Sequence, residues 1–197
     1  MNRKLIIGVS GASGIRYTLR LLQQIPLLRG KYSEIHLIYT EAAKLVAKYE
    51  EDIDDLESFL AHYELDSINS EKDWVSPLAS SSRLINSDMV VIPASMNTIA
   101  KISSGIQDNL LLRAATSIIR LRGKLVLVVR ETPLSSIDLE NLFRLSKNGA
   151  IVLPASPGFY GKPSSINDLV DFIIGKVLDV LGVENELYKR WSIRSDD

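Results

Sequence analysis

The chain has 197 residues, 46% of them hydrophobic and 24% charged, so it is long enough to bury one sizeable core and short for two. Its 23 basic and 24 acidic residues give a net charge of −1, which offers no general attraction to nucleic acid or to an anionic membrane surface. Because cysteine is absent, disulfides, thiolate nucleophiles and Cys-ligated metals are excluded.

The first predicted strand covers residues 4–9 and runs into the glycine-rich stretch SGASG, residues 10–14, before a helical pattern over 15–28. Basic residues ahead of an apolar run are typical of a signal peptide, but this run reaches glycine too soon, and we interpret it as a strand. No apolar stretch approaches the about 18 residues that a membrane span requires. We therefore expect a soluble, cytoplasmic protein.

The SGASG turn leaves backbone N–H groups and the positive end of a helix facing a ligand. Ser10 occupies the second glycine position of G-x-G-x-x-G, and Thr40 stands where an acidic residue would bind a ribose, so NAD is disfavoured. The lysine of a P-loop is missing, which disfavours nucleoside triphosphates. The turn by itself does not distinguish an anion site or polar-ring site from an ordinary tight turn, because any tight turn needs glycine.

The second predicted strand, residues 34–40, contains His36, which we interpret as a strand residue satisfied by its neighbours. His36 and His62 form no metal-binding spacing, so we expect neither a catalytic histidine nor zinc. After helical patterns over 41–49 and 52–63 comes an aperiodic, serine-rich segment, residues 64–88. It is either a surface excursion or a loop over the cleft with Trp74 as an aromatic lid.

The third predicted strand, residues 89–95, ends in PASMNT, where Ser95, Asn97 and Thr98 stand at a helix start. Each of these residues singly could be a helix cap. A second helix start follows at Gly105 and Asp108, with Arg113 one turn into that helix. Two hydroxyl-rich strand ends together with VVRETPLS favour a flavin or mononucleotide cleft over caps alone.

Continuous apolar runs alternate with helical patterns to the end of the chain, as expected for parallel strands covered on both faces. This predicts a single-domain α/β fold with an open, doubly wound, mainly parallel sheet whose ligands bind at the carboxyl ends of the strands. The remaining predicted strands cover residues 124–131 and 150–156, and the remaining helices 106–122, 136–148 and 166–182.

Four motifs together resemble the flavin prenyltransferase (UbiX) family: GVSGASG, PASMNTIAKISSGIQDNLLLRAA, KLVLVVRETPLSSIDLENL and LPASPGFYGKPSSINDLVDFI. The resemblance runs from residue 3 to Trp191. It implies a flavodoxin-like Rossmann variant, one FMN-binding flavoprotein domain over residues 1–197, with the segment 183–197 packing on a neighbouring subunit. Family members form homo-oligomers, usually dodecamers, with FMN between subunits.

The resemblance implies a reaction that joins a dimethylallyl group from dimethylallyl monophosphate to N5 and C6 of reduced FMN. The prenylated FMN serves a UbiD-type decarboxylase, and no metal is required. The implied FMN contacts are Gly11, Ala12, Ser13, Thr40, Ser95, Met96, Asn97, Thr98 and Arg130. The implied catalytic residues are Ser13, Glu50, Arg113 and Glu131. The implied substrate-binding residues are Trp74, Arg120, Arg130, Tyr160, Lys176 and Trp191.

The chemistry agrees with that assignment, because breaking an allylic C–O bond of a monophosphate leaves an anion that cationic donors must stabilise. Other interpretations stay open for single residues: Arg130 could pair with Glu131, Arg120 could be a solvated helix residue, and Tyr160 a packed loop aromatic. Rival functions are a flavin-dependent cysteine decarboxylase, since PASMNT is similar to PASANT of that family, and a non-catalytic FMN-binding module.

The chain departs from the family pattern at several positions. Arg120 replaces a common lysine and Lys176 a common arginine, so both charges survive while the hydrogen-bond geometry changes. The usual ASGS is ASSS over residues 79–82, and the usual PCS is PAS over residues 93–95. The position of Trp74 and the preferred chain length of the allyl donor depend on these changes.

Overall fold

A computed structural model describes residues 3–191 of the chain, and its centre is a six-stranded sheet. Every neighbouring pair is parallel, and the strand order is β3-β2-β1-β4-β5-β6. The expected open, doubly wound sheet is therefore confirmed. The strands are β1 (Lys4–Val9), β2 (Glu34–Tyr39), β3 (Ser67–Ser70), β4 (Ser87–Ala94), β5 (Leu125–Val129) and β6 (Ile151–Pro154).

Helices fill the crossovers between the strands. The pattern predicted over 15–28 is divided into two helices by a turn at Gln23 and Gln24, and Pro26 lies in the first turn of the second, where its missing N–H costs nothing. The helices are α1 (Ile15–Leu22), α2 (Ile25–Arg29), α3 (Glu41–Glu51), α4 (Leu56–Leu60), α5 (Met96–Ser103), α6 (Leu110–Arg120), α7 (Ser136–Lys147) and α8 (Ile166–Leu181).

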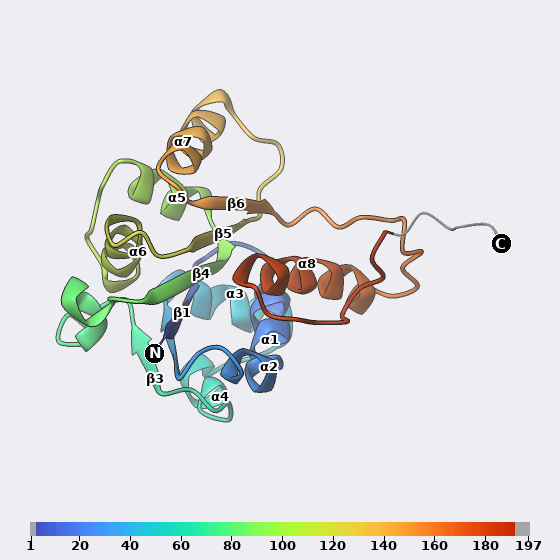
Figure 1. The fold of residues 1–197 in the computed structure, drawn as a ribbon, viewed down its shortest axis with the longest axis horizontal. Coiled ribbons are helices and arrows are strands. Elements are labelled where there is room, and N and C mark those ends of the chain that lie inside the picture. The colour runs from blue at the N-terminus through green and yellow to red at the C-terminus, as the bar shows by residue number, and fades with distance from the viewer. Residues whose placement is uncertain (1–2, 192–197) are drawn as a thin grey trace.

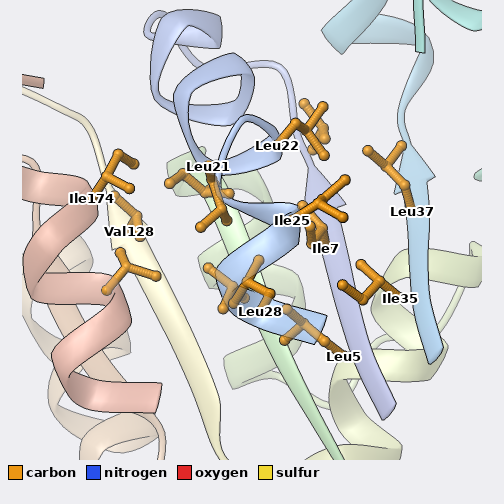
Figure 2. Close-up of a cluster of buried hydrophobic side chains, with 14 of the residues drawn as sticks. Leu5, Ile7, Leu21, Leu22, Ile25, Leu28, Ile35, Leu37, Val128 and Ile174 are labelled. Carbon is orange, nitrogen blue, oxygen red and sulfur yellow. The ribbon is translucent and has the colours of Figure 1, made fainter. Parts of the chain in front are cut away.

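Each face of the sheet is covered by its own helices, which explains the continuous apolarity of the strands. Helices α1, α2 and α8 cover one face of the sheet, and α5 and α6 cover the other (Figure 1). Leu5 and Ile7 of β1 belong to the buried cluster on the first face, whereas Ile6 belongs to the cluster on the second. Figure 2 shows the first of these clusters, in which side chains of α1 and α2 pack over β1 and β2. Its labelled members are Leu5, Ile7, Leu21, Leu22, Ile25, Leu28, Ile35, Leu37, Val128 and Ile174.

The serine-rich segment contains an edge strand that the sequence pattern misses. Strand β3 has the sequence SINS, in which the one buried residue is Asn69, so it carries no apolar signal. The Asn69 side chain donates to the Leu37 carbonyl at 3.1 Å and accepts from the Ser76 hydroxyl at 2.9 Å. These bonds fix the start of the following loop onto the sheet.

A buried charge cluster closes the amino edge of the sheet, away from the strand carboxyl ends. Asp88 is fully buried, and its two oxygens accept hydrogen bonds from Nε and Nη2 of Arg3, each at 2.9 Å. The Tyr32 hydroxyl and the Lys124 backbone N–H also donate to it, at 2.8 and 3.0 Å. Burial opposes the charged form of Asp88, but these donors outweigh it and hold the pKa of the carboxyl group below its ordinary value.

Candidate functional site

The reversal of strand order lies between β1 and β4, where doubly wound sheets open their ligand crevice. Ser10 joins the two strand ends there: its hydroxyl group donates to the Pro93 carbonyl at 2.8 Å and accepts the Ser95 backbone N–H at 2.8 Å. Ser10 is buried, so these bonds are shielded from water. The glycine-rich loop and the PASMNT segment therefore form one continuous surface.

Gly11 allows the loop to approach helix α3. A Cβ atom at this position would lie 2.3 Å from the Cβ of Ala42, which no packed structure tolerates without a shift. The Ala12 N–H donates to the Ser10 carbonyl at 3.0 Å, which holds the turn tight. In the described part of the chain, the N–H groups of Gly11 and Ser13 have no acceptor, so they are available to a ligand.

Glu50 lies against this loop. Its carboxylate accepts the Gly14 N–H at 2.8 and 3.1 Å and the Ile15 N–H at 3.0 Å, at the start of α1. An anion at a helix N-terminus is favoured by the unpaired N–H groups and by the helix dipole. The Glu50 carboxylate, which the sequence analysis expects to be catalytic, is thus held by backbone donors, one of which is Gly14, the residue after Ser13.

Arg130, at the end of β5, also contacts this loop. Its Nε donates to the Ser13 carbonyl at 3.1 Å across the switch point. No ion pair joins Arg130 to Glu131 between residues 3 and 191, so the alternative that they merely pair is wrong. Glu131 is exposed and accepts the N–H of Thr132 at 3.1 Å, which leaves its second oxygen free of protein donors within the described residues.

The hydroxyl-rich strand ends do serve as helix caps. Ser95 accepts the Thr98 N–H at 3.3 Å at the start of α5, and Thr40 accepts the Ala43 N–H at 3.1 Å at the start of α3. A hydroxyl group that accepts one bond still carries a proton to donate. The Ser95 and Thr98 hydroxyl groups also share one hydrogen bond at 3.0 Å, which uses one of their two protons. Within the described residues, the other proton and that of Thr40 stay available to a ligand. Met96 is half-buried and Asn97 is exposed in the first turn of α5, beside these hydroxyl groups.

These residues fit a flavin mononucleotide. Such a ligand needs donors for its phosphate and for its ring oxygens, and the site offers free loop N–H groups, hydroxyl groups and the remaining nitrogens of Arg130. Tyr17, on α1 beneath the loop, adds an aromatic ring. Burial raises the pKa of its phenol, and the nearby Arg130 charge opposes that rise.

The Arg113 side chain is fixed by two hydrogen bonds to other parts of the chain. Its Nε donates to the Ala79 carbonyl at 2.9 Å and its Nη1 to the Gln107 side chain at 3.2 Å. The guanidinium group therefore ties the serine-rich loop to α6. Trp74 lies in that loop and is 49% exposed, so in a single chain it is not buried over a cleft.

Arg120 does not join this site within one chain. It is exposed at the end of α6, four residues before Lys124, whose carbonyl accepts the N–H of Met89 at the start of β4. A strand rises about 3.3 Å per residue, so the eight residues of β4 separate the two edges of the sheet by roughly 25 Å. Arg120 therefore lies at the opposite edge of the sheet from the switch-point loop of its own chain, and its place at the substrate phosphate stays a prediction.

Tyr160, Lys176 and Trp191 form a second group, on α8 and on the arm that extends from the sheet in Figure 1. The Tyr160 ring packs edge-on against Trp191, with centroids 5.5 Å apart, and against Phe172 at 5.9 Å. Tyr160 is thus packed, as the alternative interpretation held, yet it remains 38% exposed. In the described residues no hydrogen bond links this group to the switch-point loop.

Sequence reasoning missed Glu71, at the end of β3. Its carboxylate accepts the Glu41 N–H at 2.8 Å and the Asn109 amide at 2.6 Å, and its own carbonyl accepts the Leu110 N–H at 2.8 Å. Glu71 therefore aligns the starts of α3 and α6, which carry Thr40 and Arg113. A lone glutamate in an aperiodic segment gives no sequence signal for this role.

Metal-ligating groups and membrane-length helices are both missing between residues 3 and 191. No group of three or more His, Asp or Glu side chains there could hold a metal ion. No described helix is long and apolar enough to cross a membrane. His36 has both ring nitrogens bonded, to Ser67 and Glu34 at 2.9 and 3.1 Å, as expected of a satisfied strand residue.

Several known proteins are similar to this chain in sequence and in fold. The Flavoprotein family matches residues 1–178. Flavin prenyltransferase UbiX of Thermoplasma acidophilum is 47% identical over 95% of this chain and 99% of its own length. AnUbiX (PadA1), solved in complex with FMN and dimethylallyl pyrophosphate, gives a TM-score of 0.87 at 35% identity over 98% of both chains. A dodecameric FMN-dependent UbiX-like decarboxylase from Escherichia coli gives 0.87 at 36% identity over 96% of this chain and 99% of its own.

Proposed function

Since this chain belongs to the Flavoprotein family and is a flavin prenyltransferase of the UbiX group, we propose a specific donor and specific acceptor atoms for its reaction. A dimethylallyl group moves from dimethylallyl monophosphate to N5 and C6 of reduced FMN. The observation that carries the proposal is the loop at the switch point, where Arg130 meets the Ser13 carbonyl at 3.1 Å beside free N–H groups. The FMN complex of AnUbiX supports the choice of cofactor.

Bound FMN supplies the electron-rich ring that accepts the allyl group. Gly11, Ala12 and Ser13 hold it through the loop, with Thr40, the segment 95–98 and Arg130 completing the contacts. As the allylic C–O bond breaks, negative charge grows on the phosphate, and donors placed there stabilise the transition state more than the ground state. Tyr160, Lys176 and Arg113 take that role, while Trp74 and Trp191 shield the allyl fragment from water and face its positive charge.

The second bond joins C6 to the tertiary carbon of the transferred group. Its C=C bond takes up a proton on the neighbouring carbon, and the proton on C6 leaves to a basic group, so this edge needs a group that exchanges protons. Glu131 is exposed at the strand end next to Arg130 and has one oxygen free of protein donors within the described chain. Glu50 has both oxygens bonded to backbone N–H groups. We assign proton removal to Glu131, and to Glu50 and Ser13 the orientation of the loop at the reacting edge.

The two rival functions have less support. The resemblance to a flavin-dependent cysteine decarboxylase implies an active-site histidine and a cysteine-bearing lid. This chain has no cysteine, and both ring nitrogens of His36 are bonded, to Ser67 of β3 and Glu34 of β2. A non-catalytic FMN module leaves the second group, with its lysine and aromatic rings, without a use. Transfer of a prenyl group by the purified protein separates all three.

The active unit is a homo-oligomer with FMN near a subunit boundary. Residues 183–191 are held along α8 of their own chain by Asp179, and the segment 183–197 presents its outer side to a neighbour. Arg120 is exposed at the far edge of its own sheet, and we assign it to the substrate phosphate of an adjacent subunit. The dodecameric relative from Escherichia coli supports twelve subunits. Residues 192–197 of the proposed contact lie outside the described residues. Light scattering at micromolar concentration tests this, and a fully active monomer would contradict it.

The product is prenylated FMN, which leaves the enzyme for a UbiD-type decarboxylase in the cytoplasm. The decisive experiment is anaerobic incubation of the protein with reduced FMN and dimethylallyl monophosphate. The flavin should gain the mass of one dimethylallyl unit and change its absorbance, in the presence or absence of EDTA. Unchanged flavin would contradict the proposal, and a reaction abolished by EDTA would contradict its metal-free form.

A further inference from the structure

Residues 183–191, which we name the C-terminal strap, run back along α8 after that helix ends (Figure 1). One carboxylate on α8 holds the strap. Asp179 accepts the Asn185 amide at 2.9 Å, the Tyr188 hydroxyl at 2.6 Å and the Arg190 guanidinium group at 2.8 and 3.1 Å. Burial opposes the charge on Asp179, but these donors keep the pKa of its carboxyl group below the ordinary value.

The strap places the Tyr188 ring directly on the backbone of α8. A Cβ atom on Gly175 would lie 2.3 Å from the ring, so glycine is required at that point of the helix. The ring meets Phe172 edge-on, with centroids 5.1 Å apart. Together the two rings form one wall beside the next helical residue, Lys176.

The Lys176 ammonium group lies over this wall. Its Nζ is 4.7 Å from the Tyr188 centroid and 5.4 Å from the Phe172 centroid, both within cation–π range. The Tyr188 hydroxyl raises the pKa of Lys176, so the amine stays charged. The wall continues from Phe172 to Tyr160, so it also aligns the aromatic ring proposed to meet the substrate phosphate.

We propose that Tyr188, fixed by Asp179, is a positioning residue that holds Lys176 for the phosphate of the allylic substrate. The inference rests on the proposed function, in which Lys176 binds that phosphate. A lysine needs such a wall because its ammonium group sits on a flexible four-carbon chain, whereas an arginine presents a rigid planar fork. The aromatic wall of Tyr188 and Phe172 therefore gives the Lys176 ammonium group the fixed position that its own side chain does not provide.

The test compares Tyr188→Leu, which removes the ring, with Tyr188→Phe, which keeps the ring and loses the bond to Asp179. For Tyr188→Leu we expect KM for dimethylallyl monophosphate to rise roughly threefold to tenfold, as loss of a cation–π contact predicts. The kcat and the FMN affinity should stay near wild type. Tyr188→Phe should raise KM about twofold, since the wall remains but is less firmly held. Adding Lys176→Arg to Tyr188→Leu should restore most of the KM, which a general loss of stability would not allow.

The matched control is Phe143→Leu on α7, which removes the ring under Lys147, 5.5 Å from its Nζ, and should leave KM unchanged. A readout independent of turnover is the rate of tryptic cleavage after Lys189, which should rise in Tyr188→Leu as the strap loosens. If the wild type transfers the prenyl group but Tyr188→Leu has an unchanged KM for dimethylallyl monophosphate, this inference is overturned and the proposed function stands. Equal losses of FMN binding and substrate binding also overturn it. No transfer by the wild type overturns the proposed function and this inference with it.

Discussion

The carboxylate of Glu50 accepts the backbone N–H of Gly14 through both of its oxygens, at 2.8 and 3.1 Å. The two residues are 36 positions apart, and their contact joins the end of α3 to the first turn of α1. It places a negative charge at a helix N-terminus and beside the loop that carries Ser13. The chain thus provides its own anion for this helix end.

Glu50→Gln should weaken this junction while keeping a carbonyl oxygen as an acceptor. The loss of charge at the helix end should lower the free energy of unfolding by about 0.3–1 kcal/mol. Prenyl transfer should slow by more than that stability change explains, because the loop no longer orients Ser13. Urea denaturation and single-turnover kinetics measure the two effects. Unchanged turnover with lowered stability would make Glu50 a structural cap alone.

Gly11→Ala should lower FMN affinity about tenfold or more, since overpacking costs typically 1–3 kcal/mol and the loop must move away from α3. The added methyl group would fall 2.3 Å from the Ala42 Cβ. The double variant with Ala42→Gly opens that space and should recover much of the affinity. Flavin fluorescence titration measures both. Equal affinities of the single and double variants would show that this close approach does not shape the flavin site.

Glu131→Gln should slow prenyl-flavin formation by about 10²–10⁴-fold, the usual contribution of a general acid or base, while FMN affinity changes little. The amide is isosteric and keeps a polar contact but cannot accept the proton. Single-turnover kinetics at saturating substrate, with flavin affinity measured separately, test this. Glu140→Gln, an exposed glutamate on α7, is the matched control and should behave as wild type. If Glu131→Gln loses FMN yet turns over normally when flavin is bound, its catalytic assignment must be dropped.

Asp88→Asn should destabilise the protein by about 3 kcal/mol near pH 7, because it breaks a buried pair with Arg3 and weakens two further bonds. The folded pKa of Asp88 lies below the unfolded value, so its stabilising contribution is present above about pH 4 and is lost as the pH falls further. The difference between wild type and variant should therefore shrink in acid.

Urea denaturation at fixed protein concentration, from pH 7 down to the acid range, checks this sign. Asp54→Asn is the control, since Asp54 is 82% exposed beside Lys48 and such surface pairs contribute about 0–1 kcal/mol. A difference for Asp88→Asn that stays constant as the pH falls would contradict the role of its charge.

The sequence by itself determined the layers of this fold. Continuous apolar runs predicted β1, β2, β4, β5 and β6, because a parallel strand buried on both faces has no polar alternation. Strand β3 was not predicted because this edge strand has no buried apolar side chain. Its buried residue, Asn69, is held by a hydrogen bond to the Leu37 carbonyl of β2. Local chemistry also offered the cap role that Ser95 has, since a cap depends on residues within one turn, whereas the cap at Thr40 was not predicted.

The tertiary structure decided which of the predicted site residues meet. Ser10 and Ser95 are 85 positions apart, and Arg130 and Ser13 are 117 apart, yet both pairs are bonded because crossovers bring strand ends to one edge. The same packing puts Arg120 at the opposite edge of the sheet from Ser13. It also brings Glu71 to Asn109 and Tyr188 to Asp179. Periodicity reports the burial of each element, whereas contacts between elements depend on strand order and on how the helices pack.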